Sequence, residues 1–189
     1  IIFFQKIGKG SYVPWAPVFV VGDDRDKKEI LLALDESVRF LPQDLDATSP
    51  QKRYAESLVR RRLHQAEFRG RVIKAYRTRC AICLLAHGEL LDAAHIVADA
   101  AEDGQPIVSN GLSLCKIHHA AYDRDFIGLS PDLRVHVDSG LLAEIDGPML
   151  KHGLQEMHGR ELQVPARKSD RPDRDRLAAR FEKFRQRAG

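Results

Sequence analysis

The sequence predicts an α+β fold, and three observations lead to this prediction. Residues 1–50 contain runs that alternate with the two-residue period of β-strands. Residues 51–79 contain a long stretch without helix breakers, which is typical of a helix. The third observation is the stretch LCKIHHAAYD, Leu114 to Asp123, which places a cysteine, two adjacent histidines and an aspartate close together in a chain with only three cysteines. This density of metal-binding side chains points to a functional site.

The N-terminal residues predict a β-hairpin. The run VPWAPVFVVGDD is rich in strand-forming residues, RDKK is a charged turn, and EILLALDE is the returning strand. Residues 1–50 are therefore a β-rich segment, expected to be the end of an N-terminal domain, and residues 51–189 are expected to form the second domain. Because the chain begins without Met in what reads as the middle of a strand, we expect it to be a piece of a longer protein.

Helices are predicted on both sides of the centre of the chain. Ser49 and Pro50 form a helix start signal, with Ser as the N-cap and Pro at the first helical position. Gly70 interrupts the pattern only mildly, and apolar residues there follow a four-residue spacing: Phe68, Val72 and Tyr76. Residues 171–187 predict a C-terminal helix that starts around Pro172. Its apolar face consists of Leu177, Phe181 and Phe184.

Between these helices the sequence predicts a β-hairpin followed by a helix. GELLDAAHIVAD reads as the first strand, AEDGQP as a loop and IVSNGLSLC as the second strand. KIHHAAYDRDF then reads as a helix, and LRVHVDS as a later strand. The unusual polar residues all lie on this hairpin and this helix.

Charge is segregated along the chain, although the net charge is only +3. Residues 51–79 carry ten Lys or Arg against two Glu, and residues 167–189 carry nine basic against four acidic residues, whereas residues 80–166 carry five basic against thirteen acidic residues. Basic flanks suit a phosphate backbone, although for any single charge run a solvated helix face is the better explanation until the motifs below are considered. No run is long and apolar enough for a membrane span or a signal peptide, so we expect a cytoplasmic protein with no membrane contact.

The three cysteines and one histidine have the spacing of a zinc site. Cys80 and Cys83 form C-x2-C, and Cys115 with His118 forms C-x2-H. Zinc prefers four thiolate or imidazole ligands in a tetrahedron, and a two-residue spacer lets one turn present two of them. Three thiols cannot pair completely, and disulfides are disfavoured in the cytoplasm. The alternative is that the three cysteines are simply small buried apolar residues.

A second set of polar residues predicts a separate site, distinct from the zinc motif. Successive residues of a helix are rotated by about 100°, so His119 faces a different site from its neighbour in the zinc motif. Asp123 lies four residues later on the same helix face, where both side chains can reach one divalent cation. Asp92 and His95 lie on or near the first strand, and Asn110 precedes the second. These residues meet only if the chain folds as β-β-α.

The order His95, Asn110, His119, interleaved with the zinc motif, resembles the HNH endonucleases. The strings LDAAHIV and NGLSLCKIHHAAYDRDFIGLS are similar to the HNH domain at the C-terminal end of bacterial restriction endonucleases, including modification-dependent ones. The resemblance covers about residues 60–140, with the nuclease core at about 66–140. It implies a zinc-stapled ββα-metal core with flanking helices, preceded by a partial β-rich domain that recognises DNA.

The resemblance also implies roles for the site residues. His95 would be the general base that deprotonates water, with Asn110 supporting it or bracing the hairpin. His119, Asp123 and Asp92 would bind the catalytic cation, expected to be Mg²⁺ or Mn²⁺, with Ni²⁺ or Zn²⁺ as further options. Many relatives carry a metal ligand directly before the base, where this chain has Ala94. Asp92 shares a strand face with that position, so it is the expected substitute, although it also reads as a strand-end carboxylate with no ligand role.

The expected substrate is double-stranded DNA. A row of basic residues precedes the nuclease core and would contact phosphates: Arg60, Arg61, Arg62, Arg69, Arg71, Lys74, Arg77 and Arg79. Cutting both strands requires two active sites, so a homodimer is expected. The leading hypothesis is thus a metal-dependent DNA endonuclease of a restriction or defence system. The alternatives are a zinc-stabilised DNA-binding module that does not cut, and an RNA nuclease or toxin.

Overall fold

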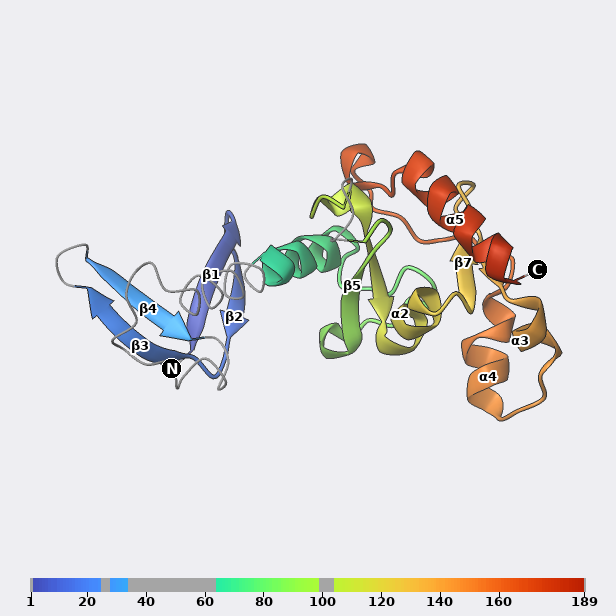
Figure 1. The fold of residues 1–189 in the computed structure, drawn as a ribbon, viewed down its shortest axis with the longest axis horizontal. Helices are drawn as coiled ribbons and strands as arrows, with labels where there is room; N and C mark the ends of the chain where they lie inside the picture. The colour runs from blue at the N-terminus through green and yellow to red at the C-terminus, as the bar shows by residue number, and fades with distance from the viewer. Residues whose placement is uncertain (1, 25–27, 34–63, 99–103, 189) are drawn as a thin grey trace. The chain divides into compact units, whose positions relative to one another are not determined.

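The computed structural model describes residues 2–24, 28–33, 64–98 and 104–188 (Figure 1). The chain divides into two compact units, Ile1–Gly70 and Arg71–Gly189. The helix start predicted at Ser49 and Pro50 lies outside the described residues. Within the described parts of the chain, no helix has the length and apolar composition needed to cross a membrane.

The first unit contains two antiparallel β-hairpins. Their strands are β1 (Phe3–Gly8), β2 (Ser11–Trp15), β3 (Phe19–Asp24) and β4 (Glu29–Ala33). The hairpin predicted around RDKK is confirmed, since Asp24 pairs with Glu29 on either side of that turn. The preceding run VPWAPVFVVGDD is divided between β2 and β3, not one strand as expected. Pro17 lies at the break, and a proline cannot donate a ladder hydrogen bond.

A helix spanning residues 64–75 leads toward the cysteine motif. The predicted apolar face is confirmed, because Phe68, Val72 and Tyr76 are all buried. The helix stops where Arg77 and Thr78 adopt left-handed backbone conformations, with φ of 54° and 53°. The Tyr76 hydroxyl donates a hydrogen bond of 3.3 Å to the carbonyl of Gly111, which ties the end of this helix to the start of the second core strand.

The predicted hairpin followed by a helix is confirmed in the second unit. Its elements are β5 (Leu91–His95), β6 (Gly111–Cys115) and α2 (Lys116–Asp123). The two strands are antiparallel, with Leu91 opposite Cys115 and His95 opposite Gly111. Each strand is shorter than the sequence suggested because a 3-10 turn precedes it. These turns are η2 (Gly88–Leu90) and η3 (Val108–Asn110). Every residue of β6 is buried, and α2 packs against both strands.

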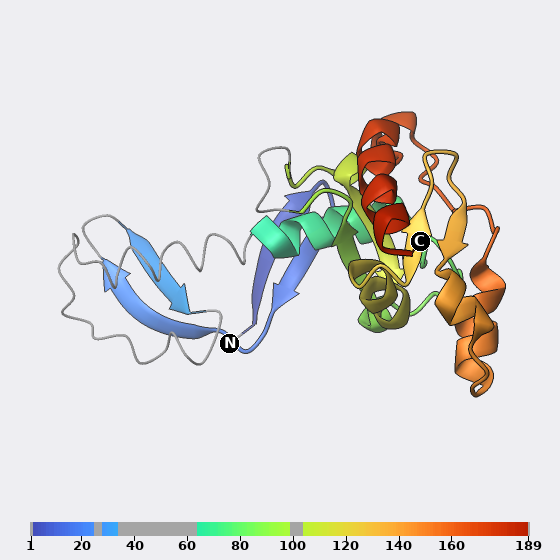
Figure 2. The ribbon, with the colours of Figure 1, turned by 45° about the vertical axis from the view of Figure 1, so that its right-hand side comes forward.

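The remaining elements follow α2 in the chain and gather beside the ββα core (Figures 1 and 2). They are β7 (Ile127–Leu129), β8 (Val135–Val137), α3 (Ser139–Ala143), α4 (Pro148–Gly153), η4 (Gln155–Met157), η5 (Lys168–Asp170) and α5 (Arg174–Ala188). The strand predicted at LRVHVDS is β8, which pairs with β7. The C-terminal helix α5 begins slightly later than expected because Asp173 caps it, its Oδ1 accepting hydrogen bonds from the N–H groups of Asp175 and Arg176.

Helix α5 packs against β7 through a close contact, and ion pairs join α5 to Asp125 just before that strand. Gly128 of β7 has no side chain, and a Cβ built there would lie 2.3 Å from the ring of Phe184. Asp125 is buried between α2 and β7, and its carboxylate pairs with Arg180 and Arg187 of α5. Arg180 also donates to the Tyr122 carbonyl at 2.9 Å. The C-terminal helix is therefore fixed to β7 and to the end of α2.

Candidate functional site

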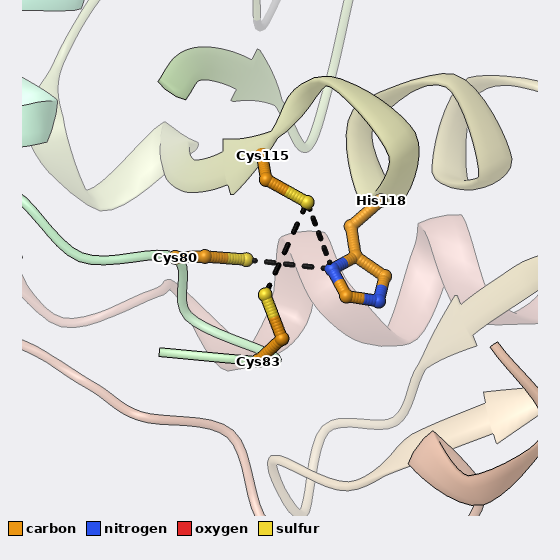
Figure 3. A group of neighbouring side chains, drawn as sticks. All are labelled: Cys80, Cys83, Cys115 and His118. Atoms are coloured by element: carbon orange, nitrogen blue, oxygen red, sulfur yellow. Dashed lines mark hydrogen bonds between the residues drawn. The ribbon is translucent and has the colours of Figure 1, made fainter. Parts of the chain in front are cut away.

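The predicted zinc ligands converge in one cluster (Figure 3). The ligand atoms of Cys80, Cys83, Cys115 and His118 all lie within 4.8 Å of one another. The Cys115 sulfur lies 3.2 Å from Nδ1 of His118, and the Cys80 sulfur 3.5 Å from the same atom. Three sulfurs and one imidazole nitrogen around a common point are the ligand set of a structural zinc site. The donor set therefore fits the expected ion.

Backbone geometry presents these ligands. Residues 80–85 form a tight knuckle in which the N–H of Leu84 bonds the Cys80 carbonyl at 3.0 Å and the N–H of Cys80 bonds the Leu85 carbonyl at 3.0 Å. The knuckle is joined to the core because the N–H of Ala81 donates to the Ser113 carbonyl at 2.7 Å. Cys115 is the N-cap of α2, so the i to i+3 spacing brings the fourth ligand onto the first helical turn.

The orientation of the His118 ring is set by α4. Nε2 lies 2.8 Å from the backbone carbonyl oxygen of Gly153. A carbonyl only accepts, so Nε2 donates and Nδ1 is the nitrogen directed at the sulfurs. A hydrogen bond of this kind fixes the tautomer of a metal-binding histidine. The contact was not foreseen from the sequence, because a backbone carbonyl has no residue signature.

The electrostatics of the cluster couple the four side chains. Burial by itself would lower the pKa of the His118 imidazole, but contacts with the Cys115 and Cys80 sulfurs outweigh burial and raise that pKa to about 10. The pKa of the Cys80 thiol is lowered, first by its interaction with Cys115, whereas the pKa of Cys83 is raised by its contact with Cys115. A proton thus compensates one thiolate, and a cation binding there must displace protons.

His119, the neighbour of the last zinc ligand, contacts two carboxylates instead of the sulfurs. Its Nδ1 lies 3.7 Å from Oδ2 of Asp92, and its Nε2 lies 3.3 Å from Oδ2 of Asp123. Two atoms that bind one Mg²⁺ or Mn²⁺ at about 2.1 Å are at most about 4.2 Å apart, so either pair fits a shared ion. The two carboxylates face different ring nitrogens of His119, however. In this arrangement one of them can share an ion with His119 while the other contacts the remaining nitrogen.

Lys116 is a member of this site that the sequence reasoning missed. It is the first residue of α2, and its ammonium forms an ion pair with Oδ2 of Asp92, the same oxygen that faces His119. The side chain of Asp92 is only 26% exposed, so this partner is a substantial part of its surroundings. The signal was present in LCKIHHAAYD, where Lys116 lies three residues before His119 and hence near it on the helix.

His95 and Asn110 lie at the other end of the hairpin. His95 is the last residue of β5, is half-buried and pairs in register with the residue after Asn110. The buried Asn110 side chain accepts a hydrogen bond from the N–H of Val97 at 2.9 Å and donates to its carbonyl at 3.0 Å and to that of Gln105 at 3.1 Å. The Asn110 carbonyl accepts from Ile96 at 3.0 Å. Asn110 therefore braces the chain directly after His95.

The predicted basic row is partly visible. Arg60, Arg61 and Arg62 lie outside the described residues. Four of the other members are exposed and one is half-buried: Arg71, Lys74, Arg77 and Arg79 are the exposed ones, and Arg69 is half-buried. Arg79 is turned toward the cysteine knuckle, where it donates to the Leu84 carbonyl at 3.5 Å.

A family model described as HNH endonuclease matches residues 80–130. The match begins at the first cysteine of the cluster and contains β5, β6, α2 and β7. The chain contains an HNH endonuclease domain. The resemblance inferred from the interleaved motifs is thereby confirmed, as is the α+β fold with a Cys3His cluster, and the HNH family is a family of nucleases.

Comparison with solved structures finds a modification dependent TagI restriction endonuclease. It is 20% identical in sequence, with a TM-score of 0.43, and the match covers 62% of this chain and 37% of that protein. The HNH-containing chain thus spans well under half the length of this structural neighbour. No curated protein matches the chain.

Proposed function

We propose that this chain is a metal-dependent HNH endonuclease that hydrolyses phosphodiester bonds of double-stranded DNA. The observation that carries the proposal is the separation of the two adjacent histidines in an HNH domain: His118 turns to three sulfurs, while His119 turns to Asp92 and Asp123. A purely structural zinc module would need the sulfur contacts of His118 but not the carboxylate contacts of His119.

In this account Zn²⁺ is a structural ion. Its four ligands come from the knuckle at residues 80–83, from Cys115 at the end of β6 and from His118 in α2. Bound there, the ion would join the knuckle to the start of the helix that carries His119. Most of the cluster is buried, which suits a closed structural site better than one that must admit substrate.

The catalytic cation would bind at His119 with Asp92 or Asp123 as carboxylate ligand. When bound there, Mg²⁺ or Mn²⁺ would supply positive charge against the negative charge that develops on the phosphate and on the leaving oxygen. The other carboxylate faces the second ring nitrogen of His119 and would orient the imidazole ring. Mixed imidazole and carboxylate ligands also admit Ni²⁺.

His95 is the proposed general base. An imidazole titrates near neutral pH, so it can accept the proton of the attacking water and pass it on. Asn110 would act through His95, because its three side-chain hydrogen bonds fix the backbone that follows the strand end. A displaced strand end would misplace the base relative to the phosphate.

The remaining parts of the proposal concern DNA and its recognition. The exposed members of the basic row, Arg71, Lys74, Arg77 and Arg79, would contact phosphates, which gives affinity but no sequence preference. Two copies would be needed to cut both strands, so the working form would be a homodimer. The β-rich residues 1–50 would belong to the domain that selects the site, as in the restriction enzymes that the sequence resembles. Such an enzyme would act on DNA in the cytoplasm.

Cleavage assays test this function. Wild-type protein and His95→Ala are incubated with plasmid and with modified phage DNA in Mg²⁺, Mn²⁺, Ni²⁺ or EDTA, and zinc content is measured for both proteins. We expect cutting by the wild type alone, stopped by EDTA at concentrations that leave zinc bound. His152→Ala is a matched control. The His152 ring of α4 is exposed, and it contacts the carboxylate of Glu156 in η4.

Two other outcomes support competing functions. DNA binding without cutting by either protein would favour the zinc-stabilised binding module. Cutting of RNA but not of duplex DNA would favour an RNA nuclease or toxin. Equal cutting by wild type and His95→Ala would show that the base lies elsewhere.

A further inference from the structure

The ammonium of Lys116 pairs with the Asp92 carboxylate oxygen that faces His119, where it would compete with the proposed cation. Oδ2 of Asp92 pairs with Lys116 and also faces Nδ1 of His119 at 3.7 Å. Lys116 follows Cys115 directly and begins α2, so its backbone is held between two members of the Cys3His cluster, Cys115 and His118. Only its side chain can move away. The Lys116 ammonium therefore already lies beside the carboxylate at which the proposed cation would bind.

The surroundings of Lys116 allow such a movement. The lysine side chain is 56% exposed, whereas that of Asp92 is 26% exposed. A long lysine stem can keep its place while its charged end turns into solvent. The carboxylate has less freedom, because it belongs to strand β5 within the core hairpin. Arrival of a divalent cation at Asp92 would repel the ammonium, because two positive charges a few ångströms apart raise each other's energy, and the exposed lysine is the partner that can move away.

A phosphate is the natural next partner for the displaced ammonium. The ion pair places Lys116 beside the residues that would meet the scissile phosphate, and lysine binds phosphate as a point charge without demanding one geometry. An exposed surface ion pair by itself contributes little to stability. The position of this one, on a carboxylate in contact with His119, gives it a role that stability does not explain.

We propose that Lys116 exchanges partners during the reaction cycle, from Asp92 in the cation-free protein to a DNA backbone phosphate once a divalent cation is bound. This inference rests on the proposed function, because it takes Asp92 as a ligand of the catalytic cation. Lys116 is then both a competitor of the cation and a contact for the substrate. The exchange makes tight DNA binding depend on the loaded site.

The first test measures cation binding without DNA. The zinc-loaded chain is titrated with Mn²⁺ by calorimetry, comparing wild type, Lys116→Met, Lys116→Arg and Asp92→Asn. Removal of the competing charge should tighten Mn²⁺ binding several-fold in Lys116→Met, and Lys116→Arg should resemble the wild type. Lys151→Met removes an exposed lysine of α4 and should change nothing.

The second test measures DNA affinity against salt concentration, using a fluorescent duplex of mixed sequence. His95→Ala serves as the background, so that the duplex stays intact. In Mn²⁺, adding Lys116→Met should reduce the slope of log affinity against log salt by about 0.9, the value for one phosphate contact. In EDTA the same substitution should leave the slope unchanged, because Lys116 is then paired with Asp92.

Each failure has a distinct meaning. Equal Mn²⁺ affinity in wild type and Lys116→Met would overturn the exchange, as would a loss of slope that is the same in EDTA and in Mn²⁺. If Asp92→Asn also leaves Mn²⁺ affinity unchanged, the ion does not bind Asp92, and that part of the proposed function fails together with the inference.

Discussion

Nε2 of His118 lies 2.8 Å from the carbonyl oxygen of Gly153, so the imidazole that faces the cysteine sulfurs is also tied to α4. The cluster therefore connects three parts of the domain: the knuckle around Cys80, the start of α2, and α4. Loss of the cluster should therefore disturb all three parts of the domain and not only the four ligands.

Removal of the metal should unfold much of the second unit. Zinc binding to comparable small sites is worth about 10–16 kcal/mol, which is as large as the whole stability of a typical domain, about 5–15 kcal/mol. Cys115→Ser is expected to purify with little zinc and to lose the cooperative thermal transition of the wild type. Mass spectrometry of bound metal and calorimetry check this. Ser169→Ala, which changes an exposed hydroxyl far along the sequence, is the control.

Zinc affinity should fall as pH falls. In the metal-free protein the pKa of His118 is raised to about 10 and that of Cys83 is also raised, so both groups carry protons at neutral pH that zinc must displace. Cys80 has a lowered pKa and releases none. Release of at least these two protons predicts an affinity loss of about 100-fold or more per pH unit. Competition with a chelator between pH 6 and 8 measures the slope, and a pH-independent affinity would contradict these protonation states.

Asp125 should be the residue on which the docking of α5 depends most. Its carboxylate is buried and pairs with Arg180 and Arg187. Asp125→Ala would leave Arg180, whose side chain is 19% exposed, without its counter-charge, and we expect a loss of about 2–4 kcal/mol in the free energy of unfolding. Arg187→Ala should cost under about 1 kcal/mol, because that side chain is 72% exposed. Equal effects in urea denaturation would mean that the pair is not buried in solution.

Gly128 should be intolerant of even one added carbon. A Cβ there would lie 2.3 Å from the Phe184 ring, so Gly128→Ala must push α5 away from β7 and should cost about 1–3 kcal/mol. Gly147→Ala is the matched control, since a Cβ at that glycine meets nothing within 4 Å. The double variant Gly128→Ala/Phe184→Ala should show less than the sum of the two single losses. Additive losses would place the strain elsewhere.

The core of the site could be predicted from the sequence because its signals are local. Paired two-residue spacers identify Cys80, Cys83, Cys115 and His118, and helix geometry alone separates His119 from its neighbour. The structure confirms that the first four converge. The roles of the residues around His119 stay predictions.

The rest depends on contacts between residues distant in sequence, which leave no periodic pattern. Asp125 and Arg180 are 55 positions apart, and no sequence motif near either residue predicts their ion pair. The pairing of Lys116 with Asp92 requires the strand register to be known. The division of the N-terminal strand at Pro17 follows from a local signal, because a proline cannot donate a ladder hydrogen bond.

Two adjacent histidines of α2 are proposed to serve two different centres. Zinc content and DNA cleavage rate, measured for His119→Ala beside the wild type, test this separation. We expect one zinc per chain in both proteins and cleavage by the wild type alone. Loss of zinc from His119→Ala, or cleavage at the wild-type rate with zinc retained, would contradict it.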